Sequence, residues 1–463
     1  MHITRRQAIA TAATAPLVLA QATRNTPPPN IVYIMADDLG YADLSCYGRR
    51  DYSTPNIDRI ASDGMKFMQA YANSSVCSAT RTALITGRYQ YRLQVGLEEP
   101  LAGNRNLGIP AGHPTLPSLL KKAGYGTTLL GKWHLGSMAE FSPLHAGYDH
   151  FFGFHGGGVD YFTHKSGIAS SNTGDLWDDD VKIEKAGYMT DLLGDRAVSV
   201  VGDYAKAGRP FLVSLHFNAP HWPWEGPEDE AESQRLRGGI QDYDGGSLAT
   251  YARMVTRMDM QVGRVLETLE NAGIAQNTIV IFTSDNGGER FSDTWPFTGK
   301  KTELLEGGLR IPAIVRWPRH IPAGSTTQQV AITMDWLPTL VAAAGTQPDP
   351  AYPPDGMSLL PVLTAGAAPV PRKLYWRYRA NAQRAVRDGD MKWLKLGENT
   401  YLFNVVSDPL ERANLKNRQA DVYQRLVSDY EAWNATMLPE DPKLNSATFT
   451  GAQLADHYGN SPK

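Results

Sequence analysis

Apolar runs that end in polar turns recur along the first three quarters of the chain. The run at residues 31–35 is uninterrupted, which is typical of a strand buried on both faces of a sheet. Further strands are expected at residues 126–130, 211–217 and 278–283, and amphipathic helices at residues 55–64, 116–123, 191–205 and 247–271. This alternation predicts an α/β fold, with a large, mostly parallel sheet sandwiched by helices.

The character of the chain changes near residues 361–371, where Ala, Gly and Pro predominate. Beyond this linker a helix is expected at residues 419–437, preceded by short strands joined by turn residues at 374–378, 385–387, 391–396 and 401–404. We therefore expect a small C-terminal subdomain, an antiparallel sheet with a helix packed on it. The predicted divisions are a main domain at 30–365, this αβ subdomain at 372–440 and a tail at 441–463.

Residues 1–22 are predicted to be a signal peptide rather than part of the fold. Arg5 and Arg6 precede a modestly apolar stretch at residues 8–20, and Ala20-Gln21-Ala22 supplies the small residues of a cleavage site. Paired arginines before such a stretch resemble a bacterial twin-arginine export signal, the alternative being a frayed amphipathic helix. The stretch is short for a membrane span of roughly 20 residues. We therefore expect an exported protein, periplasmic or secreted, with no membrane span.

The composition narrows the class of protein. Of the 463 residues, 42% are hydrophobic and 20% are charged, which is ordinary for a globular enzyme and argues against long disorder. The 45 basic and 48 acidic residues give a net charge of −3, so there is no broad basic field for nucleic acid. The two cysteines cannot form a disulfide scaffold or a Cys-rich zinc site. Local motifs must therefore carry the chemistry.

Polar residues that could bind a ligand follow two of the predicted strands. Asp37 and Asp38 come after the first strand, and Asp285 and Asn286 come after the strand at 278–283. The carboxyl ends of parallel strands meet at one edge of a sheet, where ligands bind, so these side chains are expected to converge. Oxygen ligands of this kind suit Ca²⁺ or Mg²⁺ rather than zinc. Each pair taken alone is also compatible with a turn or a helix cap.

A second group of residues could bind an anion at the same edge. Lys132 and His134 are alternate residues at another strand end, and His221 follows a further strand. Cys77 is expected at or near the start of a helix, where free peptide N–H groups favour an anion. Arg81 lies one turn later on the same face and can pair with that anion. The alternative for Cys77 is a buried structural cysteine.

Five motifs, taken together, resemble those of the type I, formylglycine-dependent sulfatases. The cysteine motif and the lysine–histidine motif match the two signatures of that family, and the other three follow in the family's order. The motifs are Cys77-Ser78-Ala79-Thr80-Arg81, Gly131-Lys132-Trp133-His134-Leu135-Gly136, Ala219-Pro220-His221, Ser284-Asp285-Asn286-Gly287 and Glu306-Gly307-Gly308. The resemblance covers residues 30–317 and implies an alkaline-phosphatase-like fold, which the small C-terminal subdomain also fits.

The resemblance implies a nucleophile and a metal site. Cys77 would be converted by a formylglycine-generating maturation enzyme to formylglycine, whose hydrated form attacks sulfur and then expels sulfate. One Ca²⁺ ion would be held by Asp37, Asp38, Asp285, Asn286 and the converted side chain of Cys77.

The remaining matched residues would surround the sulfate group. The resemblance implies that Arg81 holds the hydrated nucleophile and that Lys132 and a second lysine bind sulfate oxygens. His134 would act as the base in sulfate elimination, and His221 as the proton donor to the leaving oxygen. In the family the second lysine stands five positions before the Glu of Glu-Gly-Gly, which selects Lys301 over the adjacent Lys300.

The chain departs from the family within the first signature. The family usually has Pro two positions after the cysteine, where this chain has Ala79, and this difference bears on which maturation enzyme acts. Such conversion acts on an unfolded chain, whereas a twin-arginine route exports folded protein, so conversion would precede export. A bridge between Cys46 and Cys77 would consume the nucleophile, and we therefore interpret Cys46 as a free core thiol.

Two aromatic segments could contact the substrate. The Gly-rich loop at residues 151–165 is either a packed loop or a substrate wall in which His155, Asp160 and His164 contact the group that bears the sulfate. Trp222, directly after His221, could stack on an aryl or sugar ring or simply pack against its neighbours.

The sequence therefore predicts a calcium-dependent sulfuric ester hydrolase that cleaves sulfate monoesters, of sulfated saccharides in preference to small aryl sulfates. Two alternatives remain. A phosphomonoester or phosphonate-ester hydrolase would need a site of the same geometry, and a non-catalytic sulfoglycan-binding protein would keep Cys77 as an unmodified thiol.

Overall fold

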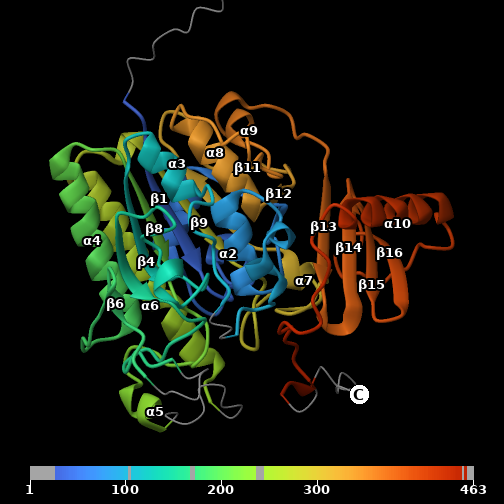
Figure 1. Ribbon diagram of the computed structural model, residues 1–463, viewed down its shortest axis with the longest axis horizontal. Helices are drawn as coiled ribbons and strands as arrows, with labels where there is room; N and C mark the ends of the chain where they lie inside the picture. The colour runs from blue at the N-terminus through green and yellow to red at the C-terminus, as the bar shows by residue number, and fades with distance from the viewer. Residues whose placement is uncertain (1–26, 103–105, 167–172, 236–244, 451–452, 456–463) are drawn as a thin grey trace, which may run out of the picture.

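The structure is a computed structural model that describes residues 27–102, 106–166, 173–235, 245–450 and 453–455. The predicted signal peptide at residues 1–22 lies outside the described residues. A large α/β body and a smaller four-stranded sheet lie side by side, as Figure 1 shows.

A ten-stranded sheet forms the centre of the large body. Its strands in spatial order are β11 (Ser325–Thr327), β2 (Met65–Phe67), β10 (Ala313–Arg316), β9 (Thr278–Ser284), β1 (Asn30–Ala36), β8 (Phe211–His216), β4 (Gly126–Lys132), β5 (His150–Phe154), β6 (Trp177–Asp178) and β7 (Val181–Lys182). The five strands from β9 to β5 are mutually parallel, and β10 runs antiparallel to β9. The predicted fold class is therefore confirmed.

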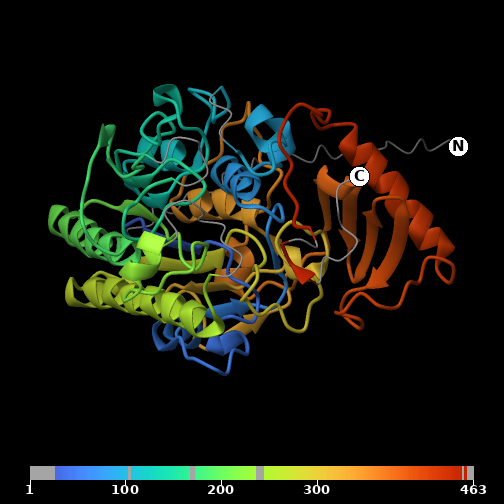
Figure 2. The same cartoon turned by 90° about the horizontal axis from the view of Figure 1, so that it is seen from below.

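Successive residues of β1 pack on opposite faces of the sheet, as the alternation of side chains along a strand requires. Val32 and Ile34 belong to a core with the helices α1 (Pro55–Ser62), α4 (Met189–Ala207) and α6 (Leu248–Asn271). Ile31 and Tyr33 belong to a second core with α2 (Cys77–Thr86), α3 (Leu116–Lys122) and α8 (Trp336–Ala343). The two helical layers enclose the sheet, as Figure 2 shows.

Local sequence explains where several of these helices begin and end. The side chain of Thr115 accepts from the Ser118 N–H in a capping box at the start of α3, and Ser247 caps α6 in the same way. Gly208 ends α4 with a φ of 61°, a left-handed conformation that suits glycine. Thr54 precedes α1 but does not cap it, because its hydroxyl donates to the Asp58 carboxylate instead of accepting a helix N–H.

The C-terminal subdomain is an antiparallel sheet of β13 (Lys373–Tyr378), β14 (Gln383–Asp388), β15 (Met391–Leu396) and β16 (Asn399–Asn404). Helix α10 (Ala420–Asn434) covers one face, over Val386 and Leu402. The other face packs Trp376 and Leu394 against the large body, next to Ala79 of α2. The subdomain thus lies directly against the helix that begins at Cys77.

Within the described ranges, no helix combines the length and the apolar character needed to cross a lipid bilayer.

Candidate active site

The predicted ligand residues converge at the carboxyl edge of the parallel strands. Asp37 follows β1, Asp285 follows β9, and Lys132 is the last residue of β4. The Lys132 ammonium lies 2.6 Å from the Asp37 carboxylate, and the Asp38 amide donates to Asp285 Oδ1 at 3.2 Å. All four residues are buried. Strand ends far apart in sequence therefore form one polar site.

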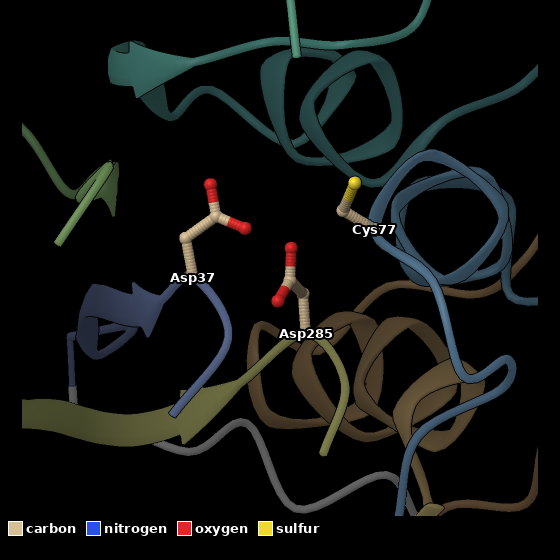
Figure 3. A group of neighbouring side chains, drawn as sticks. All are labelled: Asp37, Cys77 and Asp285. Carbon is tan, nitrogen blue, oxygen red and sulfur yellow. The ribbon is translucent and has the colours of Figure 1, made fainter. Parts of the chain in front are cut away.

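Cys77 lies at this site as the first residue of α2. The residue before it, Val76, has extended backbone angles, so the helix begins at Cys77. The sulfur and carboxylate oxygens of Asp37 and Asp285 all lie within 4.8 Å of one another, and Figure 3 shows the three side chains directed toward a common space. Burial raises the pKa of the Cys77 thiol. Cys46 and Cys77 are both free cysteines.

Arg81 ties α2 to the strand ends. Its guanidinium donates to Asp285 Oδ2 through Nε at 3.1 Å and Nη2 at 2.8 Å, a bidentate contact that fixes both side chains. Burial would raise the pKa of Asp285, but the charges of Arg81 and Lys132 outweigh burial and hold it below its usual value. His216 lies behind Arg81, with Nδ1 3.3 Å from Nη1. This supporting histidine was missed from the sequence, where no spacing distinguished it from core residues.

Asp38 contacts three further polar side chains of the site. Its Oδ2 lies 2.6 Å from the Lys301 ammonium and 3.6 Å from His221 Nε2, and its Oδ1 accepts from Asn286 Nδ2 at 2.7 Å. Burial would lower the pKa of Lys301, but Asp38 and nearby groups outweigh it and raise the pKa, which keeps the amine charged. Lys301 therefore brings its charged amine to the site through this contact with Asp38.

The acidic residues fit a hard divalent cation. Asp37 Oδ1 and Asn286 Oδ1 are buried oxygen atoms without a hydrogen-bond partner among the described residues, an arrangement that is costly unless a ligand satisfies them. Burial raises the pKa of Asp37, as expected for a carboxylate whose charge is incompletely compensated. Three aspartates and one asparagine offer only oxygen donors, which Ca²⁺ and Mg²⁺ prefer.

Two histidines at the site, His134 and His221, each have one ring nitrogen bound to a backbone carbonyl. His134 Nε2 lies 2.8 Å from the Leu101 carbonyl oxygen, and His221 Nδ1 lies 2.7 Å from that of Trp222. Because a carbonyl only accepts, those nitrogens carry the protons of the neutral rings, which leaves His134 Nδ1 and His221 Nε2 as the nitrogens able to accept a proton. Burial, followed by neighbouring lysine charges, lowers the pKa of both rings.

The Gly-rich loop brings backbone against both rings. A β-carbon on Gly157 would lie 2.7 Å from His134 Cε1, and one on Gly158 would lie 3.2 Å from His221 Cε1. The loop side chains that could contact the substrate instead pack against or bind other protein groups. His155 stacks between Phe151 and Trp177, Asp160 accepts from Ser233, and His164 Nε2 lies 3.0 Å from the Gly187 carbonyl oxygen. These contacts favour the packed-loop interpretation for all three.

Two further residues lie near the site. The sequence analysis does not identify Glu289, and it leaves Trp222 with two interpretations, substrate stacking or packing. Glu289 is buried close to Lys301, and burial raises the pKa of its carboxyl to about 7. Its place three residues after Asn286, in the same strand-end loop, is the signal that could have found it. Trp222 packs its ring 4.2 Å from the His221 ring, with the Lys301 ammonium 5.9 Å away. It is 8% exposed and so offers little surface for stacking.

A mostly parallel sheet with a buried polar site at the carboxyl edge of its strands is the architecture of the alkaline-phosphatase-like fold. The sulfatase family model matches residues 29–346, and a model described as N-sulphoglucosamine sulphohydrolase, C-terminal, matches residues 297–435. The chain therefore belongs to the sulfatase family and is a sulfuric ester hydrolase.

Relatives align over nearly the whole chain. N-acetylgalactosamine-6-sulfatase of Rattus norvegicus is 32% identical over 477 residues, which cover 90% of this chain and 88% of that protein. The crystal structure of Ps i-CgsB in complex with k-i-k-neocarrahexaose superposes with a TM-score of 0.81 at 29% identity, over 93% of this chain and 97% of that one. A phosphonate monoester hydrolase of Agrobacterium radiobacter shares the fold at 20% identity, with a TM-score of 0.60 over 88% and 95% of the chains.

Proposed function

We propose that the chain hydrolyses sulfate monoesters of sulfated saccharides, using a formylglycine made from Cys77 and a calcium ion. The observation that carries this proposal is the meeting of the Cys77 side chain with Asp37 and Asp285 in one buried site that also holds Arg81 and Lys132. The saccharide part rests on the names of the relatives, which include an N-acetylgalactosamine-6-sulfatase and a protein in complex with a neocarrahexaose.

Different residues of the site would supply the nucleophile, hold the metal ion and bind the sulfate group. Hydrated formylglycine would supply one hydroxyl that attacks sulfur and a second hydroxyl whose deprotonation re-forms the aldehyde and expels sulfate from the first oxygen. Asp37, Asp38, Asp285 and Asn286 would hold Ca²⁺, which would polarise the nucleophile and sulfate oxygens. Lys132 and Lys301 bring two buried positive charges to bind sulfate oxygens, and Arg81 orients position 77.

The two histidines serve opposite proton transfers in this proposal. His221 would donate from Nε2 to the leaving oxygen, since its Nδ1 is already bound to a carbonyl. His134 would accept a proton at Nδ1 when sulfate is expelled. The sulfate charge offsets Lys132 and Lys301, the cations that disfavour protonation of His221 in the free site.

Two measurements test the proposal. Mass spectrometry of the peptide that contains position 77, from protein made in its native host, should show formylglycine in place of cysteine. An aryl sulfate should be turned over faster than the matched aryl phosphate, and sulfated hexosamines should also be hydrolysed. An unmodified peptide would favour a binding protein, and faster phosphate turnover would favour a phosphoryl ester hydrolase. Cys77→Ala, expected to fold and to be inactive, is the matched control.

A further inference from the structure

Residues 444–447 lie along the active-site segment Glu98–Leu101, and we call residues 444–447 the strap. Glu99 N–H donates to the Asn445 carbonyl at 3.0 Å, and Ala447 N–H donates to the Glu99 carbonyl at 2.7 Å. The two chains form a parallel bridge between Glu99 and Ser446. A segment without helix or strand of its own is thereby held by backbone bonds from the end of the chain.

The Glu99 side chain adds hydrogen bonds to the strap and to the C-terminal subdomain. It is buried, and its Oε2 accepts from the Arg379 N–H at 2.9 Å and from the Ser446 hydroxyl at 3.4 Å. The Tyr378 hydroxyl, at the end of β13, lies 3.1 Å from the Glu99 carbonyl oxygen and also donates to the Ala447 carbonyl. The strap and the C-terminal subdomain therefore both form hydrogen bonds with Glu99.

Two residues after Glu99, the chain reaches the catalytic site. Leu101 N–H donates to the hydroxyl of Ser78, the neighbour of Cys77, at 2.8 Å, and the Leu101 carbonyl lies 2.8 Å from His134 Nε2. His134 Nδ1 is buried and has no hydrogen-bond partner among the described residues. A neutral imidazole has one donor and one acceptor nitrogen, so the Leu101 carbonyl decides which nitrogen can take a proton.

We propose that the strap and Glu99 are positioning elements for His134: they hold the Leu101 carbonyl against Nε2 and so keep Nδ1 as the proton acceptor. The proposal rests on the proposed function for the meaning of that proton transfer. None of these residues is required to touch substrate. They act through the orientation and the tautomer of one ring, as the partners behind a catalytic histidine commonly do.

The test uses the full-length protein and variants of Glu99 and Ala447. Ala447→Pro keeps the carbonyl of residue 447 but removes its N–H, which donates to the Glu99 carbonyl. Glu99→Ala removes the carboxylate that accepts from Arg379 and Ser446. Glu99→Gln keeps an acceptor oxygen, and Lys443→Ala changes an exposed neighbour of the strap. The tautomer of His134 is read by NMR on protein with ¹⁵N-labelled histidine, its signal assigned with His134→Gln.

We expect a single Nε2–H tautomer in the parent protein, in Glu99→Gln and in Lys443→Ala. Ala447→Pro and Glu99→Ala should show mixed tautomers, with kcat lower by about 10- to 100-fold and KM changed less than about threefold. If either disrupting variant folds and keeps the parent tautomer and kcat, the proposal is wrong. The tautomer can be read even if the parent protein proves inactive on sulfate esters, so the two proposals fail separately.

Discussion

Replacing Lys392 by methionine tests how the C-terminal subdomain is fixed to the catalytic body. Lys392 lies in β15, is fully buried, and has its ammonium 2.9 Å from both Glu306 and Glu411. Glu306 begins α7 (Glu306–Leu309), close in sequence to Lys301, and also accepts from Arg310 and Tyr71 at 2.6 Å. Methionine keeps an apolar stem of similar shape and removes the ammonium group with its charge and its N–H donors.

The loss of stability expected for Lys392→Met depends on which charges remain near Glu306 and Glu411. Glu306 keeps Arg310, but Glu411 is left as a buried carboxylate facing another, and loss of one partner of a buried pair costs about 3–5 kcal/mol. Burial already raises the pKa of Glu411 to about 7. Because this folded-state pKa lies above the unfolded value, its contribution to stability is present at low pH and is lost as pH rises through 7.

The charge mechanism therefore predicts a pH-dependent loss. At pH 8 we expect Lys392→Met to lower the free energy of unfolding in urea, followed by tryptophan fluorescence, by about 3–5 kcal/mol. At pH 5 a proton on Glu411 relieves the repulsion, and the loss should shrink by at least about 1.4 kcal/mol, the equivalent of one pKa unit. Adding Glu411→Gln should restore most of the stability lost at pH 8. A loss under about 1 kcal/mol at pH 8, or an equal loss at both pH values, would refute the reasoning.

Three further predictions concern the active site. His221→Ala should reduce kcat far more for sugar alcohol leaving groups than for nitrophenol-like ones, since only the former need a proton; equal losses would remove the acid role. Ca²⁺ at 100 times its Kd should stabilise the parent by about 2.7 kcal/mol in thermal unfolding, and Asp285→Asn should lose this effect, whereas an unchanged Ca²⁺ response in that variant would exclude Asp285 as a ligand. Lys301→Met should lower kcat/KM by at least about 100-fold and Lys300→Met by less than about threefold, as the contact of Lys301 with Asp38 requires; similar effects of both would contradict it.

Much of the fold and of the candidate site could be predicted because both depend on local patterns. The long strands carry enough consecutive apolar residues to be recognised, and parallel strands must bring their carboxyl ends to one edge, so Asp37, Lys132 and Asp285 were expected to meet. The two outermost strands at each end of the sheet, β11, β2, β6 and β7, have only two or three residues each, and such short segments have no clear period.

Features that depend on tertiary contact left no signal in the sequence. The His134 ring binds the backbone carbonyl of Leu101, 33 residues away, and the strap binds Glu99 through backbone bonds across more than 340 residues. No side-chain pattern encodes a backbone partner. The start of α1 gives a related example, because the Thr54 hydroxyl donates to the nearby carboxylate of Asp58 instead of capping the helix.

The close approach of Gly157 and Gly158 to the two imidazoles limits how the protein can be redesigned. A methyl group at either place would press on a ring to which the proposed mechanism gives a fixed orientation, so a library that randomises the loop should hold both positions as glycine. Selection for new sugars would then act on the residues to either side of the two glycines, and both imidazole rings would keep their places.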